Sequence, residues 1–163
     1  MKKVLVIMGS DSDLKVMESC VERLQSFSIP VSVRVCSAHR TPNTAEQLAK
    51  NAAADGFGVI IAAAGKAAHL GGVLAAHTTL PVIGVPMSTH VMGGMDSLLS
   101  MVQMPKGIPV ATVTIDGADN AAILAAQILA LSDESLKEKL CRQKEAMAAQ
   151  VAAKDELIQK RFS

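Results

Sequence analysis

Short apolar runs alternate with amphipathic segments along the chain. The runs have the length of β-strands, and the first, from Val4 to Met8, contains no polar residue, as expected of a parallel strand buried on both faces. The predicted strands are 4–8, 31–36, 59–62, 81–85 and 109–115. Between and after them, the spacing of apolar positions predicts helices over 14–26, 42–54, about 70–78, 96–103, 118–131 and about 133–159.

Five strands that alternate with helices across short connections are typical of βαβ units with right-handed crossovers. We therefore predict an α/β fold with a single domain over residues 1–163. Its core is a doubly wound, three-layer parallel sheet of five strands, flavodoxin-like or Rossmann-like, followed by a C-terminal helix. That helix, 133–160, carries apolar side chains between charges. We predict it at a subunit interface, with packing on its own domain as the alternative.

Composition narrows the classes of function. The net charge is +1, no basic stripe is present and aromatic residues make up 2%, which argues against nucleic-acid binding. No apolar run is long enough to span a bilayer, and the N-terminus lacks a signal-peptide pattern, so no membrane contact is expected. The three distant cysteines predict reduced thiols in a cytoplasmic protein and have no zinc-site spacing.

The stretch Ser37-Ala-His-Arg-Thr-Pro42 concentrates reactive groups at a strand-to-helix turn. Thr41 is predicted to cap the following helix, and Pro42 suits its first turn. Such turns lie on the ligand-binding edge of open α/β sheets. The hydroxyl of Ser37, the imidazole of His39 and the cation of Arg40 therefore predict acid–base chemistry on a small anion. The alternatives are an ordinary loop histidine and a surface ion pair.

Two further turns belong to the same predicted edge. In 9–13, a helix N-terminus with Ser10 and Ser12 offers donors to an anion, and one of Asp11 and Asp13 suits the helix cap or sugar hydroxyls. A plain capping box is the alternative. The small residues of 62–68 allow a flat ligand to approach, and His69 either bonds that ligand or satisfies a local backbone group. With the 37–42 turn, these features fit a phosphorylated sugar.

The remaining histidines and the methionines add less. His77 is interpreted as structural, and His90, in the loop after the fourth strand, receives no role. Several of the nine methionines lie in or near that loop, where they predict an apolar cluster at a subunit interface.

Several motifs, spread in order over residues 4–140, resemble N5-carboxyaminoimidazole ribonucleotide mutases of class I. These motifs are Gly9-Ser-Asp-Ser-Asp13, Ser37-Ala-His-Arg-Thr-Pro42, Ala67-Ala-His-Leu70, Asp96-Ser-Leu-Leu-Ser100, Val102-Gln-Met-Pro105 with Gly107-Ile-Pro-Val110, and Asn120-Ala-Ala-Ile-Leu-Ala-Ala-Gln-Ile-Leu129. The resemblance implies an enzyme of purine (IMP) biosynthesis that moves a carboxylate from an exocyclic nitrogen to a ring carbon. It also implies a homo-octamer that uses neither a metal nor an organic cofactor.

The resemblance assigns roles to the candidate residues. It implies that Ser10 and Arg40 hold the phosphate, that Asp13 binds the ribose and that Ser37 lines the site. His39 would be the general acid and base, because an imidazole can both give and take a proton near neutrality. His69 would bind substrate, and the 62–70 turn that contains it would retain the released CO2.

The sequence departs from the family pattern in three places. Gly65-Lys66 replaces Gly-Gly, Gly71 replaces a proline, and 115–120 is about two residues shorter. Lys66 is predicted to contact the migrating carboxylate. The related class II carboxylases, which use free CO2, carry a basic residue near this position, so a carboxylase is the alternative. A non-catalytic flavodoxin-like module is a remote alternative, because the third strand ends in alanines rather than a phosphoacceptor Asp.

Overall fold

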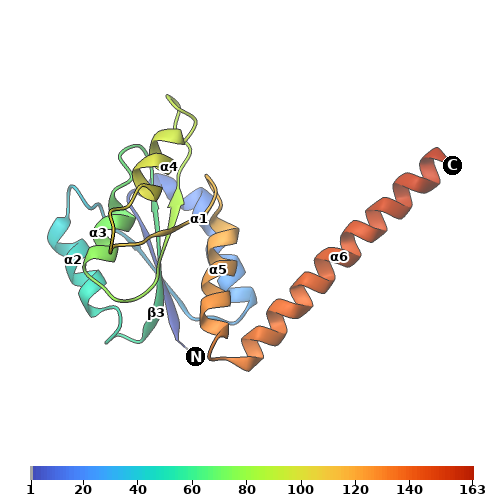
Figure 1. Cartoon of the computed structure of the whole chain (residues 1–163), viewed down its shortest axis with the longest axis horizontal. Helices are drawn as coiled ribbons and strands as arrows, with labels where there is room; N and C mark the ends of the chain where they lie inside the picture. The colour runs from blue at the N-terminus through green and yellow to red at the C-terminus, as the bar shows by residue number, and fades with distance from the viewer. Residues whose placement is uncertain (1) are drawn as a thin grey trace.

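The computed structural model describes residues 2–163, which form a parallel five-stranded sheet with helices on both faces (Figure 1). The strands are β1 (Lys3–Met8), β2 (Val31–Val35), β3 (Phe57–Ala64), β4 (Val82–Pro86) and β5 (Ala111–Thr112). The helices are the 3-10 turn η1 (Asp11–Asp13), α1 (Leu14–Ser26), α2 (Pro42–Asn51), α3 (Leu70–Ala76), α4 (Met95–Val102), α5 (Ala118–Ala130) and α6 (Glu134–Phe162).

The strand order is β2-β1-β3-β4-β5 and every pairing is parallel, which confirms the predicted flavodoxin-like sheet. Helices α1 and α5 cover one face, and α2, α3 and α4 cover the other (Figure 1). The chain reverses its direction of winding between β1 and β3. Ligands of such sheets bind beyond the carboxyl ends of the strands at this switch point.

A glycine in β4 brings α4 close to the sheet. A Cβ on Gly84 would collide with the side chain of Met101, which is fully buried on α4. Because Gly84 has no side chain, Met101 packs directly against the strand. Helix α4 therefore lies directly against β4.

The fifth strand is much shorter than predicted. Only Ala111 and Thr112 pair with β4, opposite Ile83 and Gly84, so the predicted strand over 109–115 is wrong at both ends. Pro109 has no N–H for a ladder, which is tolerated at an edge strand. The chain nevertheless follows β4, because the N–H of Val113 donates to the carbonyl of Gly84 (3.0 Å).

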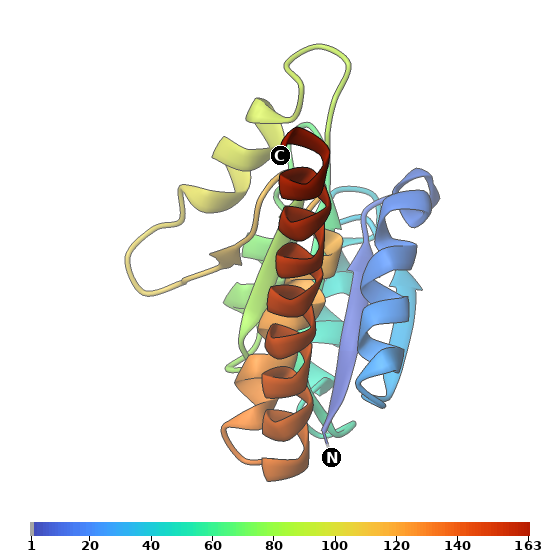
Figure 2. The same cartoon turned by 90° about the vertical axis from the view of Figure 1, so that its right-hand side faces the viewer.

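Helix α6 projects away from the domain (Figure 1), and Figure 2 views the molecule from the side that carries this helix. Asp133 caps it by accepting from the N–H of Leu136 (3.1 Å), and the Leu136 side chain is completely buried. Leu140 packs partly on the same core, whereas every residue from Lys144 to Ser163 is exposed. Packing on its own domain therefore explains only the first turns. No helix within residues 2–163 has the length and apolar character needed to cross a membrane.

Candidate active site

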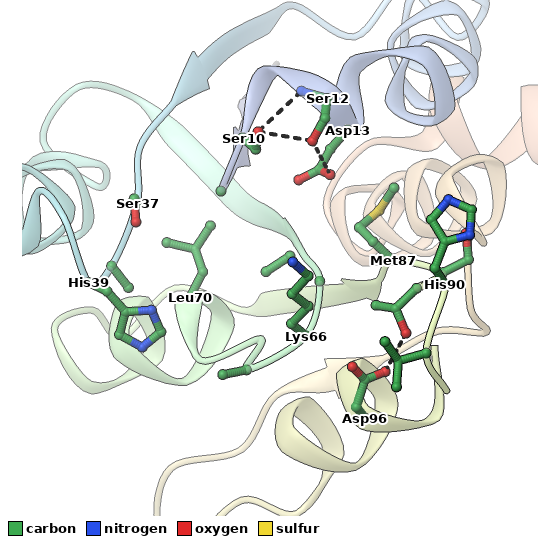
Figure 3. A pocket seen from close by; sticks show the side chains of 18 of the residues that line it. Ser10, Ser12, Asp13, Ser37, His39, Lys66, Leu70, Met87, His90 and Asp96 are labelled. Carbon is green, nitrogen blue, oxygen red and sulfur yellow. Dashed lines mark hydrogen bonds between the residues drawn. The ribbon is translucent and has the colours of Figure 1, made fainter. Parts of the chain in front are cut away.

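A cavity of about 1090 Å³ lies at the carboxyl ends of the strands (Figure 3). The loops after β1, β2, β3 and β4 all contribute to its wall. Five of the six predicted site residues line it, namely Ser10, Asp13, Ser37, His39 and Arg40. The cavity thus brings together side chains from turns that are distant in the sequence.

The loop after β1 presents a network of hydroxyl groups. Ser10 caps η1 by accepting from the N–H of Ser12 (3.3 Å). The Ser12 hydroxyl lies 2.9 Å from Ser10 Oγ and 3.4 Å from a carboxylate oxygen of Asp13. The carboxylates of Asp11 and Asp13 cap neither η1 nor α1, so the helix-cap alternative for this pair is wrong, and Asp13 remains on the cavity wall.

The Asp13 carboxyl group is partly buried and lies near two other carboxylates. Burial raises its pKa above the ordinary value, and the carboxylates of Asp11 and Asp116 raise it further. Hydrogen bonds from the Ser10–Ser12 turn oppose this shift. A carboxylate in this setting accepts hydrogen bonds from hydroxyl groups, such as those of a sugar, and repels a phosphate.

The turn that carries His39 and Arg40 closes on itself. Thr41 does not cap α2; its hydroxyl donates to the carbonyl of Ser37 (2.9 Å) and accepts from the Ser37 N–H (3.1 Å). The prediction that Thr41 caps α2 is therefore wrong, because its hydroxyl is bonded to the backbone of Ser37 within the turn. The Ser37 hydroxyl in turn accepts from the N–H of Arg40 (3.2 Å). Within residues 2–163 the guanidinium of Arg40 has no ion-pair partner, so the surface ion-pair alternative is not observed.

His39 is held by a second histidine. Its Nε2 lies 2.9 Å from Nδ1 of His69, and the two rings meet edge to face at 79°. His69 forms the N-cap position of α3, but its side chain makes no capping bond. Of the two roles predicted for His69, the local backbone contact is therefore wrong. Among residues 2–163, His69 is not one of those that line the cavity. Its contact with the site is the bond to His39.

Helix α4 fixes the loop after β3 through two serines. Lys66 has a left-handed backbone (φ +59°), and its N–H donates to Oγ of Ser97 (2.9 Å), a completely buried side chain. Oγ of Ser100 accepts from the N–H of Ala68 (3.0 Å), and its hydroxyl lies 3.1 Å from the Lys66 carbonyl. These contacts hold the backbone beside His69 from a segment about 30 residues away.

The loop after β4 is a part of the site that the sequence reasoning missed. Residues 87–92, including His90, line the cavity together with Asp96, whose carboxylate accepts from the Thr89 hydroxyl (2.8 Å). The signal was available, because this loop follows the strand next to β3 and so reaches the same edge. Gly94 ends the loop with φ +97°, a conformation that favours glycine.

No three His, Cys, Asp or Glu side chains converge to hold a metal ion within residues 2–163. The three cysteines are unpaired: Cys20 and Cys36 are buried and Cys141 is exposed on α6. Burial raises the pKa of the Cys20 thiol to about 12. None of the three lines the cavity, so the groups available for chemistry there are hydroxyls, carboxylates, imidazoles and two cations.

Residues 3–150 match the model of the AIR carboxylase family, and they include all four loops of the cavity. The chain belongs to the AIR carboxylase family. Two relatives, from Methanocaldococcus jannaschii and Pyrococcus abyssi, are named N5-carboxyaminoimidazole ribonucleotide mutase. The first is 53% identical over 98% of this chain and 99% of its own length, and the second 55% identical over 90% and 84%.

A solved structure agrees with the architecture described above. A crystal structure of Treponema denticola PurE superimposes with a TM-score of 0.86 at 29% identity. The match covers 94% of this chain and 96% of that chain. The similarity therefore extends over almost the whole chain.

Proposed function

We propose that this enzyme is an N5-carboxyaminoimidazole ribonucleotide mutase of purine biosynthesis. It would convert N5-carboxyaminoimidazole ribonucleotide to 4-carboxy-5-aminoimidazole ribonucleotide. The relatives named above support this assignment over almost the whole chain. The observation that carries it is the imidazole of His39 on the wall of a cavity that also holds hydroxyls and Arg40.

The substrate would lie across the switch point of the sheet. Ser10 at the start of η1 and the unpaired Arg40 would bind the phosphate, because both offer donors to an anion. Asp13 would accept from the ribose hydroxyls. Ser37, whose side chain is held by the Arg40 N–H, would line the wall between them. The aminoimidazole would then face His39.

His39 would move one proton in each half of the reaction. In the first half the bond between the carboxylate carbon and the exocyclic nitrogen breaks, its electron pair stays on nitrogen, and His39 protonates that nitrogen as CO2 leaves. In the second half the ring carbon attacks CO2, and His39 removes the proton from that carbon. The enzyme thus returns to its starting protonation state.

His69 would keep His39 in one orientation throughout. Because Nε2 of His39 bonds to His69, Nδ1 is the nitrogen available to the substrate. A proton on His39 Nε2 can donate to His69 Nδ1 whether Nδ1 of His39 is protonated or not. The pair therefore suits both halves of the reaction without rearrangement. We therefore assign His69 a positioning role, in place of the predicted direct contact with substrate.

Released CO2 would be retained beside the turn after β3. Ala64, Gly65 and Ala67 line the cavity there and offer a small apolar surface. CO2 carries no charge, so such a surface holds it without competing hydrogen bonds. It would remain close to the nucleotide until the ring carbon attacks.

The direct test is turnover of N5-carboxyaminoimidazole ribonucleotide by the purified protein, without ATP or bicarbonate. Formation of the 4-carboxy isomer is expected. Turnover of 5-aminoimidazole ribonucleotide with CO2, and none of the N-carboxylated compound, would instead identify a class II carboxylase. Binding of a nucleotide without turnover of either substrate would favour the non-catalytic module.

We also propose that the chain acts in the cytoplasm as a homo-octamer. Two sets of exposed apolar side chains support association with further copies. Helix α6 exposes Met147, Val151, Ile158 and Phe162 at helical spacing, and the α4 region exposes Val91, Met92, Met95, Leu99 and Val102. Sedimentation equilibrium should give eight chains, and truncation after Lys144 should give a smaller, folded species. A monomeric full-length chain would contradict the assembly.

A further inference from the structure

Lys66 holds an unusual place in the cavity wall. Its backbone is left-handed at φ +59°, a conformation that disfavours any residue with a side chain. Figure 3 shows its side chain directed into the cavity, with its nitrogen toward the turn that carries Ser10 and Asp13. Its N–H is fixed by Ser97 and its carbonyl lies within hydrogen-bond distance of the Ser100 hydroxyl. The fold therefore presents this ammonium to the cavity in a strained but supported conformation.

The cavity wall carries two cationic side chains on different loops. Among its lining residues within 2–163, Arg40 and Lys66 are the only arginine and lysine, and neither forms an ion pair with a carboxylate. Arg40 lies on the turn after β2, and Lys66 lies on the turn after β3. A ligand with two separated anionic groups would match this arrangement better than a ligand with one.

The position of His39 indicates which anionic group Lys66 meets. The His39 ring is bonded to His69, three residues beyond Lys66 on the same turn (2.9 Å). The reacting end of the substrate must contact His39, so it also lies next to the Lys66 turn. The phosphate, at the other end of the nucleotide, is left to Arg40 and the start of η1.

We propose that Lys66 is a specificity-determining residue that binds the carboxylate of the carboxylated nucleotides, with Ser97 and Ser100 as positioning residues. This rests on the proposed mutase function. The ammonium would attract a carboxylate on the exocyclic nitrogen or on the ring carbon, but it has no charge to attract once that group is CO2. It would therefore favour carboxylated over unmodified nucleotide, and its loss would raise KM rather than lower kcat.

The test compares two ligands that differ only in the carboxylate. Calorimetry measures Kd for 4-carboxy-5-aminoimidazole ribonucleotide and for 5-aminoimidazole ribonucleotide with the wild type, Lys66→Gln and Lys66→Gly. One charge-assisted hydrogen bond corresponds to at least about a tenfold change in affinity. We expect about a tenfold loss for the carboxylated ligand in both variants and no change for the unmodified one.

Two further variants separate specific from general effects. Lys106→Gln removes an exposed lysine outside the cavity and should change neither Kd. Ser97→Ala removes the acceptor of the Lys66 N–H and should weaken binding of the carboxylated ligand alone, which a general loss of structure would not do. Equal weakening of both ligands by Ser97→Ala would contradict its positioning role.

The outcomes distinguish this proposal from the proposed function. If the Lys66 variants weaken both ligands equally, or neither, while the wild type binds both and is active, the carboxylate role of Lys66 is overturned. If the wild type binds neither nucleotide, the mutase assignment itself fails. Steady-state kinetics gives an independent check, because a large fall in kcat at unchanged KM would also contradict the proposal.

Discussion

Replacement of Lys66 by glycine should stabilise the protein while weakening its site. A left-handed conformation costs a residue with a Cβ about 1–2 kcal/mol, and glycine does not bear this cost. Glycine also gains entropy in the unfolded chain, which offsets about 0.4–1 kcal/mol. With φ at +59° in the folded state, the net stabilisation of Lys66→Gly is about 0.5–1 kcal/mol. For a domain of this size that corresponds to a rise in Tm of about 1–4 °C.

Lys66→Ala is the matched control, because it removes the ammonium but keeps the Cβ and therefore the strain. Thermal unfolding of all three proteins is followed by circular dichroism at one protein concentration, since association shifts Tm. Only the glycine variant should unfold at a higher temperature than the wild type. If the glycine and alanine variants have the same Tm, the left-handed backbone carries no strain and the reasoning is refuted.

Three other substitutions test the site and the core. His39→Asn should reduce turnover by roughly 10²–10⁴-fold and leave nucleotide affinity nearly unchanged, as measured by rapid-quench kinetics and calorimetry; normal turnover would exclude its acid–base role. Burial raises the folded-state pKa of Asp13, so its ionisation destabilises the fold as the pH rises through that pKa. Asp13→Asn should therefore be more stable than the wild type at pH 7 and equal to it well below the ordinary pKa of 3.8, in denaturant titrations at both pH values; a constant difference would contradict this. Leu136→Ala empties a fully buried position and should cost about 2–5 kcal/mol of unfolding free energy. Met147→Ala, at an exposed position, should cost little when both are measured on the dissociated chain; similar losses at both positions would contradict the burial.

The sequence predicted the layers of the fold because buried parallel strands leave a strong local pattern. The runs at 4–8 and 81–85 correspond to β1 and β4 within about one residue. The same pattern failed at 109–115, since an apolar edge segment resembles a strand whether or not it finds ladder partners. Periodicity likewise identified α6 but not its exposure, because a helical pattern does not specify which molecule covers its apolar face.

The candidate site was predictable where topology alone decides. Ser10, His39 and Arg40 follow strands β1 and β2, and parallel strands deliver their carboxyl ends to one edge. The contacts that hold the site residues in place were not predictable from the sequence. The bond between His39 and His69 depends on two side-chain rotamers, and the contacts of Ser97 with the Lys66 turn join segments 31 residues apart. Such contacts exist only after the helices have packed.

The projecting part of α6 makes secondary structure depend on concentration. The helix has 29 residues and is about 43 Å long at 1.5 Å per residue, yet its own domain supports only its first turns. Isolated helical segments are marginal in water, because packing supplies most of the stability of a helix. When the assembly dissociates into single chains, the segment beyond Lys144 should therefore fray while the sheet remains intact. Far-ultraviolet ellipticity measured on dilution would then report association without any label.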